Sequence, residues 1–180
     1  ADFIYGTTHN TFSVADFARH YFGLTGPAVV VSSACSSSAK VFSSARRMIA
    51  ANLIDAAVVG GVDSLCLTTL YGFNSLGLVS EQACRPYDAQ RNGLSIGEAS
   101  AFALLERTPE DLDADAVLLL GIGESSDAYH MSSPHPDGLG ARMAMQDALK
   151  TAGLKSSEID YINLHGTATQ TNDAAEAKAV

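Results

Sequence analysis

Two residues of this sequence, a cysteine and a histidine, stand where nucleophilic chemistry would need them. Cys35 follows the apolar run 28–32 and precedes a segment with helical spacing, so its sulfur is predicted at a turn beside a helix N-terminus. Backbone N–H groups and the positive end of the helix dipole favour the nucleophilic thiolate there, and they can also stabilise an oxyanion. Residues 33–39 hold four serines and two alanines besides Cys35, which leaves room for a substrate. The alternative is a buried, inert cysteine, and local physics leaves both interpretations open.

His165 is the second candidate. It follows the apolar residues 161–164 and opens the stretch Gly166-Thr-Ala-Thr169. Ligands of α/β sheets bind at the carboxyl ends of the strands, where this histidine is predicted to lie. The alternative is a histidine that only hydrogen-bonds the next loop. Cysteine and histidine can act together although they are far apart in sequence.

Strands and helices that alternate along the chain would position these two residues. The short β-branched run 28–32 and the run 56–61 predict buried strands, and residues 36–52 between them have helical periodicity. This order predicts a βαβ unit with parallel strands. Further apolar runs predict strands at 99–105, 117–122 and 159–164, and helices are predicted at 141–152 and from Thr171 onwards. Polar, turn-rich stretches at 80–95 and 132–140 predict loops. The fold class is therefore α/β.

Composition sets limits on the function. The chain has 180 residues, of which 47% are hydrophobic and 17% charged, so it can bury a core and is not a disordered tail. Eleven basic and 20 acidic residues give a formal charge of −9, which argues against nucleic acid as a partner. No apolar run approaches the roughly 18 residues that span a bilayer, and the first residues do not resemble a secretory signal, so no membrane association is expected.

The cysteines and histidines give no metal-binding pattern. Cys35, Cys66 and Cys84 are odd in number and form no C-x-x-C pair, which argues against a zinc site, a redox motif or a disulfide framework. A reducing, cytoplasmic compartment is expected. The five histidines form no H-E-x-x-H motif, so no metal is expected.

Four motifs lie in order along almost the whole chain. They are Gly23-Leu-Thr-Gly-Pro27 with Ser33-Ala-Cys-Ser-Ser-Ser38; Arg85-Pro-Tyr-Asp88 with Arg91-Asn-Gly93 and Gly97-Glu98; Ser126-Asp-Ala-Tyr-His-Met-Ser132; and His165-Gly-Thr-Ala-Thr169 with Asn172-Asp173 and Glu176. Together they resemble motifs of the β-ketoacyl-(acyl-carrier-protein) synthases, condensing enzymes of the thiolase superfamily. The second motif resembles the family's Arg-Pro-Phe-Asp, Asp-Gly-Phe and Gly-Glu-Gly block.

The resemblance implies a thiolase-like fold with two similar halves, each a five-stranded mixed sheet layered with helices. This chain would cover the fold only in part, as an interior fragment that is inactive alone. The acidic, proline-containing stretch 108–115 predicts the boundary between the halves. Residues 1–111 would be the C-terminal part of the first half, with the nucleophilic cysteine. Residues 112–180 would be the N-terminal part of the second half, with the His-Gly-Thr-x-Thr motif.

The resemblance also implies an activity, an acyltransferase that performs a decarboxylative Claisen condensation. Cys35 would hold an acyl group as a thioester, and malonyl-acyl-carrier-protein would lose CO₂ and attack it. The product would be 3-oxoacyl-acyl-carrier-protein, in fatty acid or polyketide/aryl-polyene-type biosynthesis. The partners would be acyl carrier protein and a second subunit, in a homodimer or in a heterodimer with a related chain. No cofactor is expected, because phosphopantetheine of the carrier holds the substrates.

Residue roles follow from the same resemblance. His165 would hydrogen-bond the malonyl thioester oxygen and stabilise the enolate. Thr167 and Thr169 would bind the phosphopantetheine arm, and Ser132 and His130 would line the substrate tunnel. Asp173 and Glu176 can equally be a helix-capping and salt-bridge set outside the reacting site.

Three other classes remain to be weighed. A cysteine hydrolase is disfavoured because no glycines flank residues 33–37 in the manner of a nucleophile elbow. A non-catalytic pseudo-synthase subunit would lack the nucleophile, so Cys35 argues against it. A thiolase or acyl-CoA ketosynthase is disfavoured by the His-Gly-Thr-x-Thr pattern. Gly97-Glu98-Ala99-Ser100 departs from the usual Gly-Glu-Gly-Ala, which leaves the substrate open.

Overall fold

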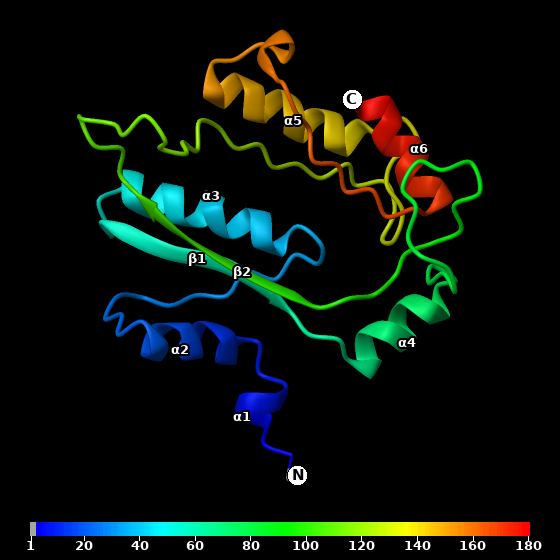
Figure 1. Ribbon diagram of the computed structural model, residues 1–180, viewed down its shortest axis with the longest axis horizontal. Helices are drawn as coiled ribbons and strands as arrows, with labels where there is room; N and C mark the ends of the chain where they lie inside the picture. The colour runs from blue at the N-terminus through cyan, green and yellow to red at the C-terminus, as the bar shows by residue number, and fades with distance from the viewer. Residues whose placement is uncertain (1–2) are drawn as a thin grey trace. The chain divides into compact units, whose positions relative to one another are not determined.

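The computed structural model describes residues 3–180, which form two compact units (Figure 1). The first unit comprises the described residues up to Ser64 together with Glu98–Ala114. The second comprises Leu65–Gly97 and Asp115–Val180. Each unit therefore draws on two separate segments of the chain, and each is described on its own below.

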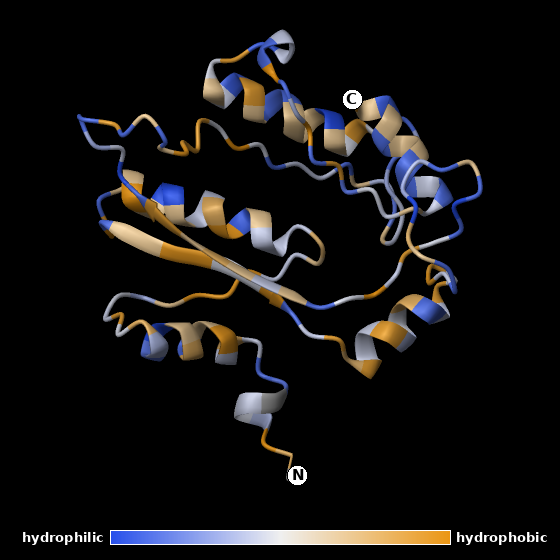
Figure 2. Ribbon diagram, viewed as in Figure 1, coloured by the Kyte–Doolittle hydropathy of each residue, from blue (hydrophilic) through white to orange (hydrophobic). Residues whose placement is uncertain are grey.

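An antiparallel pair of strands forms the centre of the first unit. Strand β1, Ala56–Asp63, pairs with β2, Ala99–Glu106, in a register that runs from Ala56 opposite Glu106 to Asp63 opposite Ala99. Both strands are coloured mainly as hydrophobic in Figure 2, as the apolar runs at 56–61 and 99–105 predicted. The two predicted strands are confirmed, and each lies within one residue or two of its expected bounds.

Helix α3, Ser37–Ala50, packs on this strand pair (Figure 1). Its buried residues Ala45 and Ile49 recur at helical spacing, and Val59 of β1 is buried as well. The helix and β1 approach closely because Gly61 has no side chain, and a Cβ there would collide with Ser38. The helix predicted from residues 36–52 is confirmed.

Two helices that the periodicity did not predict begin the first unit, α1, Tyr5–Thr8, and α2, Phe12–Tyr21. In α2 the rings of Phe17 and Tyr21 stack one turn apart, with centroids separated by 5.7 Å. Phe22, directly after α2, meets Phe102 of β2 edge-on at 6.4 Å. These aromatic contacts connect the start of the described chain to β2.

The second unit is built from helices and long loops. Its helices are α4, Leu67–Ser75; α5, Leu139–Ala152; a 3₁₀ turn, Ser156–Glu158; and α6, Gln170–Ala179. Gly138 before α5 and Gly153 after it have φ of 66° and 71°, a left-handed conformation in which glycine is favoured. The helix predicted at 141–152 with a stop at Gly153 is therefore confirmed, and α4 was not predicted.

Three of the predicted strands are not formed. Residues 28–32, 117–122 and 159–164 form no regular secondary structure, and within residues 3–180 none of them belongs to a hydrogen-bonded strand pair. The strand β1 accordingly pairs antiparallel with β2, and the parallel βαβ unit expected from its order along the chain is absent from the described residues. An apolar run specifies extended backbone, whereas a strand also needs a neighbour that pairs its N–H and C=O groups. Residues 117–123 instead lie alongside α5. Thr151 Oγ1 of this helix accepts from the N–H of Ile122 and donates to its carbonyl, both at 3.0 Å.

None of the helices within residues 3–180 combines the length and the apolar character that crossing a membrane requires.

Candidate active site

Cys35 lies at the turn that leads into α3, as the sequence predicted. Ser36 is the N-cap residue of this helix, and Ala34 has a left-handed φ of 53°. The cysteine side chain is exposed and forms no disulfide. A buried Cys35, one part of the alternative interpretation, is therefore wrong for this structure, and the reactivity of the thiol stays a prediction.

Serine hydroxyls fix the Cys35 turn. The Ser37 hydroxyl accepts from the N–H of Ser33 at 2.9 Å and donates to the carbonyl of Ala34 at 2.7 Å. The Ser36 hydroxyl donates to the carbonyl of Ser33 at 2.9 Å. The serine-rich stretch therefore closes the turn on both sides of the cysteine while its thiol stays exposed.

His165 belongs to the second unit, in a loop between an extended segment and α6. Gly166 and Ala168 in this loop have left-handed φ angles of 53° and 59°. Ala168 is completely buried, although alanine rarely adopts such a φ, whereas the His165 side chain is exposed. The loop thus has a strained but fixed backbone that presents its histidine outward.

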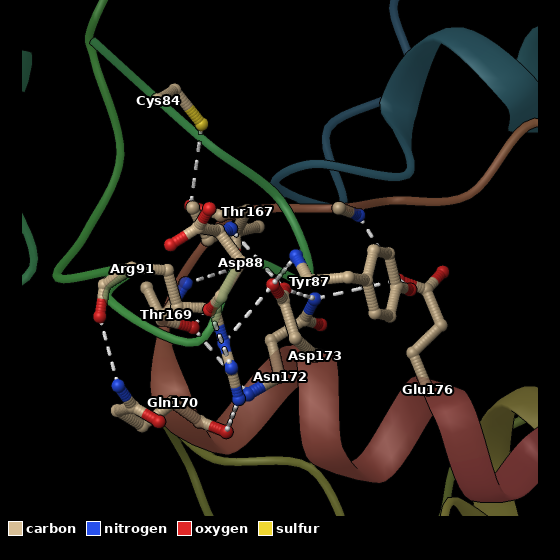
Figure 3. A network of polar contacts seen from close by, with 12 residues as sticks. Cys84, Tyr87, Asp88, Arg91, Thr167, Thr169, Gln170, Asn172, Asp173 and Glu176 are labelled. Atoms are coloured by element: carbon tan, nitrogen blue, oxygen red, sulfur yellow. Dashed lines mark hydrogen bonds and ion pairs between the residues drawn. The ribbon is translucent and has the colours of Figure 1, made fainter.

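Glu176 of α6 holds the backbone at His165. Its Oε1 accepts from the N–H of His165 at 2.6 Å, and its Oε2 accepts from the N–H of Gly166 at 3.0 Å. The hydroxyl of Tyr87 also donates to Oε2, at 2.6 Å (Figure 3). Hydrogen bonds to an ionised carboxylate are stronger than those between neutral groups, so the conformation of the histidine backbone depends on this side chain.

Asp173, one turn earlier in α6, holds the next part of the same loop. It is only 1% exposed, and its Oδ1 accepts from the N–H of Ala168 at 3.1 Å. Its Oδ2 accepts from the N–H of Tyr87 at 2.8 Å and lies 3.3 Å from Nε of Arg91, an ion pair whose N–H is not aligned for a hydrogen bond. The carboxylates of Asp173 and Glu176 therefore form the capping and salt-bridge set that the sequence offered as an alternative to a direct role (Figure 3).

The protonation states of Tyr87 and Glu176 suit this arrangement. Burial, the hydrogen bond to Glu176 and the nearby negative charges raise the pKa of Tyr87 well above its ordinary value. Burial also acts to raise the pKa of Glu176, but the donors Tyr87, Gly166 and His165 outweigh it, and the net pKa is lowered. At neutral pH the phenol is thus a donor and the carboxylate a charged acceptor.

Thr167 and Thr169, the predicted phosphopantetheine ligands, lie in the His165 loop. Their hydroxyl oxygens are 2.9 Å apart, and Thr169 Oγ1 accepts from the N–H of Asn172 at 3.4 Å as the N-cap of α6. Thr169 is nearly buried and Thr167 is half-buried. The helix predicted from Thr171 onwards therefore begins one residue earlier, and its cap is one of the predicted ligands.

Ser132 and His130, the predicted tunnel residues, lie together in an exposed loop of the second unit. The Ser132 N–H donates to His130 Nδ1 at 3.2 Å, and the Ser132 hydroxyl lies 3.3 Å from the same nitrogen. Asp127 organises this loop, since its carboxylate accepts from the N–H groups of Tyr129 and His135. These bonds, led by that from His135, lower the pKa of Asp127.

The structure thus brings His165, Thr167 and Thr169 together in one loop, while Cys35 lies in the other unit. Sequence reasoning missed the part that Tyr87 and Arg91 play in holding this loop. Their signal was the motif 85–93, which matched the family pattern but carried no assigned role. Within residues 3–180, no group of three or more His, Cys, Asp or Glu side chains could hold a metal ion.

Comparison with known proteins matches almost the whole chain to one family. Residues 3–111 match the beta-ketoacyl synthase N-terminal domain, and residues 116–180 match the C-terminal domain of the same synthases. A curated relative, 3-oxoacyl-[acyl-carrier-protein] synthase 2 of Rhizobium meliloti, is 40% identical over 168 residues, which are 87% of this chain and 40% of the relative.

Solved structures give the same result. A chain from the complex of a ketosynthase with its chain length factor, from Xenorhabdus doucetiae, superposes with a TM-score of 0.91 at 44% identity, over 99% of this chain and 43% of that one. A chain from the complex of a type II polyketide acyl carrier protein with its hexaketide-bound ketosynthase gives a TM-score of 0.86 at 25% identity over 95% of this chain and 45% of that one.

These relatives carry the thiolase-like fold that the motifs implied, and this chain covers it in part. The chain spans about two fifths of the length of the curated synthases it matches. Both domain models, the relatives and the superpositions point to the family that the four motifs implied. The chain belongs to the beta-ketoacyl synthase family.

Proposed function

We propose that the protein carrying this chain is a β-ketoacyl-acyl-carrier-protein synthase, an acyltransferase that condenses an acyl group on Cys35 with a malonyl unit on acyl carrier protein. The observation that carries this proposal is that one chain holds both an exposed cysteine before α3 and a His-Gly-Thr-x-Thr loop fixed by hydrogen bonds, and matches both domains of this family. The 3-oxoacyl-[acyl-carrier-protein] synthases and the type II polyketide ketosynthase complex among the similar proteins support condensation without selecting a pathway.

The chemistry has two parts. In the first, the Cys35 thiolate attacks the carbonyl carbon of an acyl-carrier thioester, so that a new C–S bond forms and the carrier thiol leaves. In the second, malonyl-carrier loses CO₂, and the electron pair of the broken C–C bond becomes an enolate. This enolate attacks the acyl carbon on Cys35 and releases the cysteine thiolate, which gives 3-oxoacyl-carrier.

The other residues have supporting roles. The exposed imidazole of His165 donates to the thioester oxygen on which the enolate charge develops, which is where a fixed donor lowers the barrier. The backbone N–H of Cys35 supplies one donor to the oxyanion of the first part. Thr167 and Thr169 bind the phosphopantetheine arm, and they exchange their present mutual hydrogen bond for bonds to it. Ser132 and His130 line the acyl tunnel.

Acyl carrier protein is the proposed partner, as in the ketosynthase complex among the similar structures. The second subunit is either a copy of this protein or a related chain, as in the ketosynthase–chain length factor complex. The cysteine pattern favours a reducing, cytoplasmic compartment. The 180-residue chain by itself is expected to give no 3-oxoacyl product, since it spans about two fifths of the relatives' length.

The test uses the intact protein with an acyl-carrier primer and malonyl-carrier. Mass spectrometry of proteolytic peptides is expected to find the acyl group on Cys35, released only slowly by water, and 3-oxoacyl-carrier is expected as product. Cys35→Ala should abolish both, whereas His165→Ala should keep acylation and lower condensation by about 10²–10³-fold. Cys66→Ala, at another exposed cysteine, is the matched control and should keep both reactions.

Two results would contradict the proposal. Rapid turnover of the acyl group to free acid would identify a cysteine hydrolase. Acylation from acyl-CoA but not from acyl carrier protein would identify a thiolase-like or acyl-CoA ketosynthase activity.

A further inference from the structure

Tyr87 binds two carboxylates of α6, one through its backbone and the other through its side chain. Its backbone N–H donates to Asp173 Oδ2 at 2.8 Å, and its hydroxyl donates to Glu176 Oε2 at 2.6 Å (Figure 3). Its φ of 63° is left-handed, which is rare for an aromatic residue and persists only where the surroundings fix it. The second bond needs the phenolic hydroxyl. The family motif that resembles residues 85–88 has phenylalanine at this position, and phenylalanine lacks that hydroxyl.

The hydroxyl of Tyr87 is separated from the His165 backbone by a single carboxylate. Glu176 Oε2 receives both the Tyr87 hydroxyl and the Gly166 N–H, and Oε1 receives the His165 N–H. A carboxylate is planar, so a donor that fixes one oxygen also fixes the direction of the other. The orientation of the phenol is therefore transmitted to the backbone N–H groups of both loop residues.

We propose that the Tyr87 hydroxyl is a positioning group for His165, because it orients the Glu176 carboxylate that holds the histidine backbone. The group does not touch the reacting atoms. It limits the directions in which the exposed imidazole can point, and so it increases the fraction of time for which the imidazole faces the thioester oxygen. This role in catalysis rests on the proposed function, whereas the hydrogen-bonded chain itself can be tested without any activity.

The groups around Glu176 determine how the hydrogen bonds between Tyr87, Glu176 and the His165 loop respond to pH. His165 from the loop and Tyr87 from residues 80–95 face the carboxylate, Asn172 and Asp173 lie beside it on α6, and Arg91 lies opposite Asp173. Because the pKa of Glu176 is lowered in the fold, its hold on the loop is complete above the ordinary value near 4.5 and is lost as pH falls through the lower folded value. Without the Tyr87 donor, this loss should begin at a higher pH.

The test compares Tyr87→Phe with Tyr71→Phe in the intact protein. Both substitutions remove one phenolic oxygen in the second unit, and Tyr71 in α4 is 64% exposed. Amide ¹⁵N shifts of His165 and Gly166 are followed from pH 7 to pH 3. Tyr87→Phe is expected to move both amide shifts at pH 7 and to raise their titration midpoint, and Tyr71→Phe is expected to leave both as in the unsubstituted protein. Glu176→Gln should abolish the part of the titration that belongs to the Glu176 carboxylate, and it provides a second variant if Tyr87→Phe proves unstable.

Kinetics supply the second readout. Tyr87→Phe is expected to lower kcat about tenfold with little change in KM for the carrier substrate, because a misdirected imidazole affects the reaction more than binding. Amide shifts and a midpoint that respond no more to Tyr87→Phe than to Tyr71→Phe would overturn the positioning role, even if condensation proceeds. If the amide shifts change as expected but the protein makes no 3-oxoacyl product, the hydrogen bonds from Tyr87 through Glu176 to the His165 loop are supported and the proposed function is rejected.

Discussion

The turn at Cys35 and the loop at His165 are both fixed by hydrogen bonds to backbone groups, but over very different distances along the chain. The serine bonds around Cys35 join residues at most four positions apart. The N–H groups of the His165 loop are bound by Asp173 and Glu176, 5 to 11 positions away, and these two carboxylates are bound in turn by Tyr87, 86 and 89 positions from them. The Cys35 turn is therefore held by its own sequence, whereas the His165 loop depends on the neighbouring helix and, through it, on a distant segment of the chain.

The difference has a physical reason. A nucleophile at a helix N-terminus needs only a turn and the first backbone N–H groups of the helix, which short side chains such as serine can organise. A loop with a left-handed alanine, Ala168, has a conformation that this residue does not favour, and it is held where buried acceptors satisfy the N–H groups of the loop. The buried carboxylate of Asp173 is such an acceptor, and its burial depends on α6 and residues 80–95.

Of the substitutions that test this difference, removal of the Asp173 carboxylate should lower the free energy of unfolding the most. Asp173→Ala leaves the N–H groups of Ala168 and Tyr87 without an acceptor and leaves Arg91 without its counter-charge, so the free energy of unfolding should fall by about 3–5 kcal/mol. Urea denaturation measures this change. The control is Asp137→Ala, which removes an exposed carboxylate paired with Lys178 and should have little effect. Equal losses in both variants would mean that the loop is not held through Asp173.

A side chain at Gly166 should have the next largest effect. Gly166→Ala forces alanine into a φ of 53° and places its Cβ 3.2 Å from Pro86 Cβ, so we expect a loss of about 2 kcal/mol in unfolding free energy. Gly153→Ala is the matched control, because Gly153 also has a left-handed φ but no neighbour within 4 Å of the added Cβ. Its loss should be about 1 kcal/mol, the cost of the backbone conformation alone. If the two losses are equal in thermal or urea denaturation, the contact with Pro86 has no energetic role.

The Cys35 turn should respond least. Ser37→Ala removes two local hydrogen bonds and is expected to cost about 1 kcal/mol in unfolding free energy. Faster hydrogen exchange should be confined to residues 33–37, with the His165 amide unaffected. Ser75→Ala, which removes one bond to a carbonyl within α4, is the control and should cost less. Faster exchange at the His165 amide in Ser37→Ala would show that the turn is not held locally.

Local sequence determined much of this protein. The spacing of apolar residues predicted α3, α5, β1 and β2, because each of them has a buried face or apolar run that its own residues specify. The apolar run followed by helical spacing predicted the turn at Cys35 without deciding whether the cysteine is exposed or buried, and four ordered motifs predicted the family. Thr169 was identified as a candidate before its role as the α6 cap was known.

The tertiary structure decided the rest. The apolar runs at 28–32, 117–122 and 159–164 predicted strands, but pairing depends on a neighbour that no local pattern specifies. The residues that fix the carboxylates beside the His165 loop could not be predicted either. Tyr87 and Arg91 reach Asp173 and Glu176 only when segments about 80 residues apart fold together. The sequence by itself thus determined which residues could do chemistry, and the fold determined how the histidine among them is held, since buried hydrogen bonds form only between groups that packing brings together.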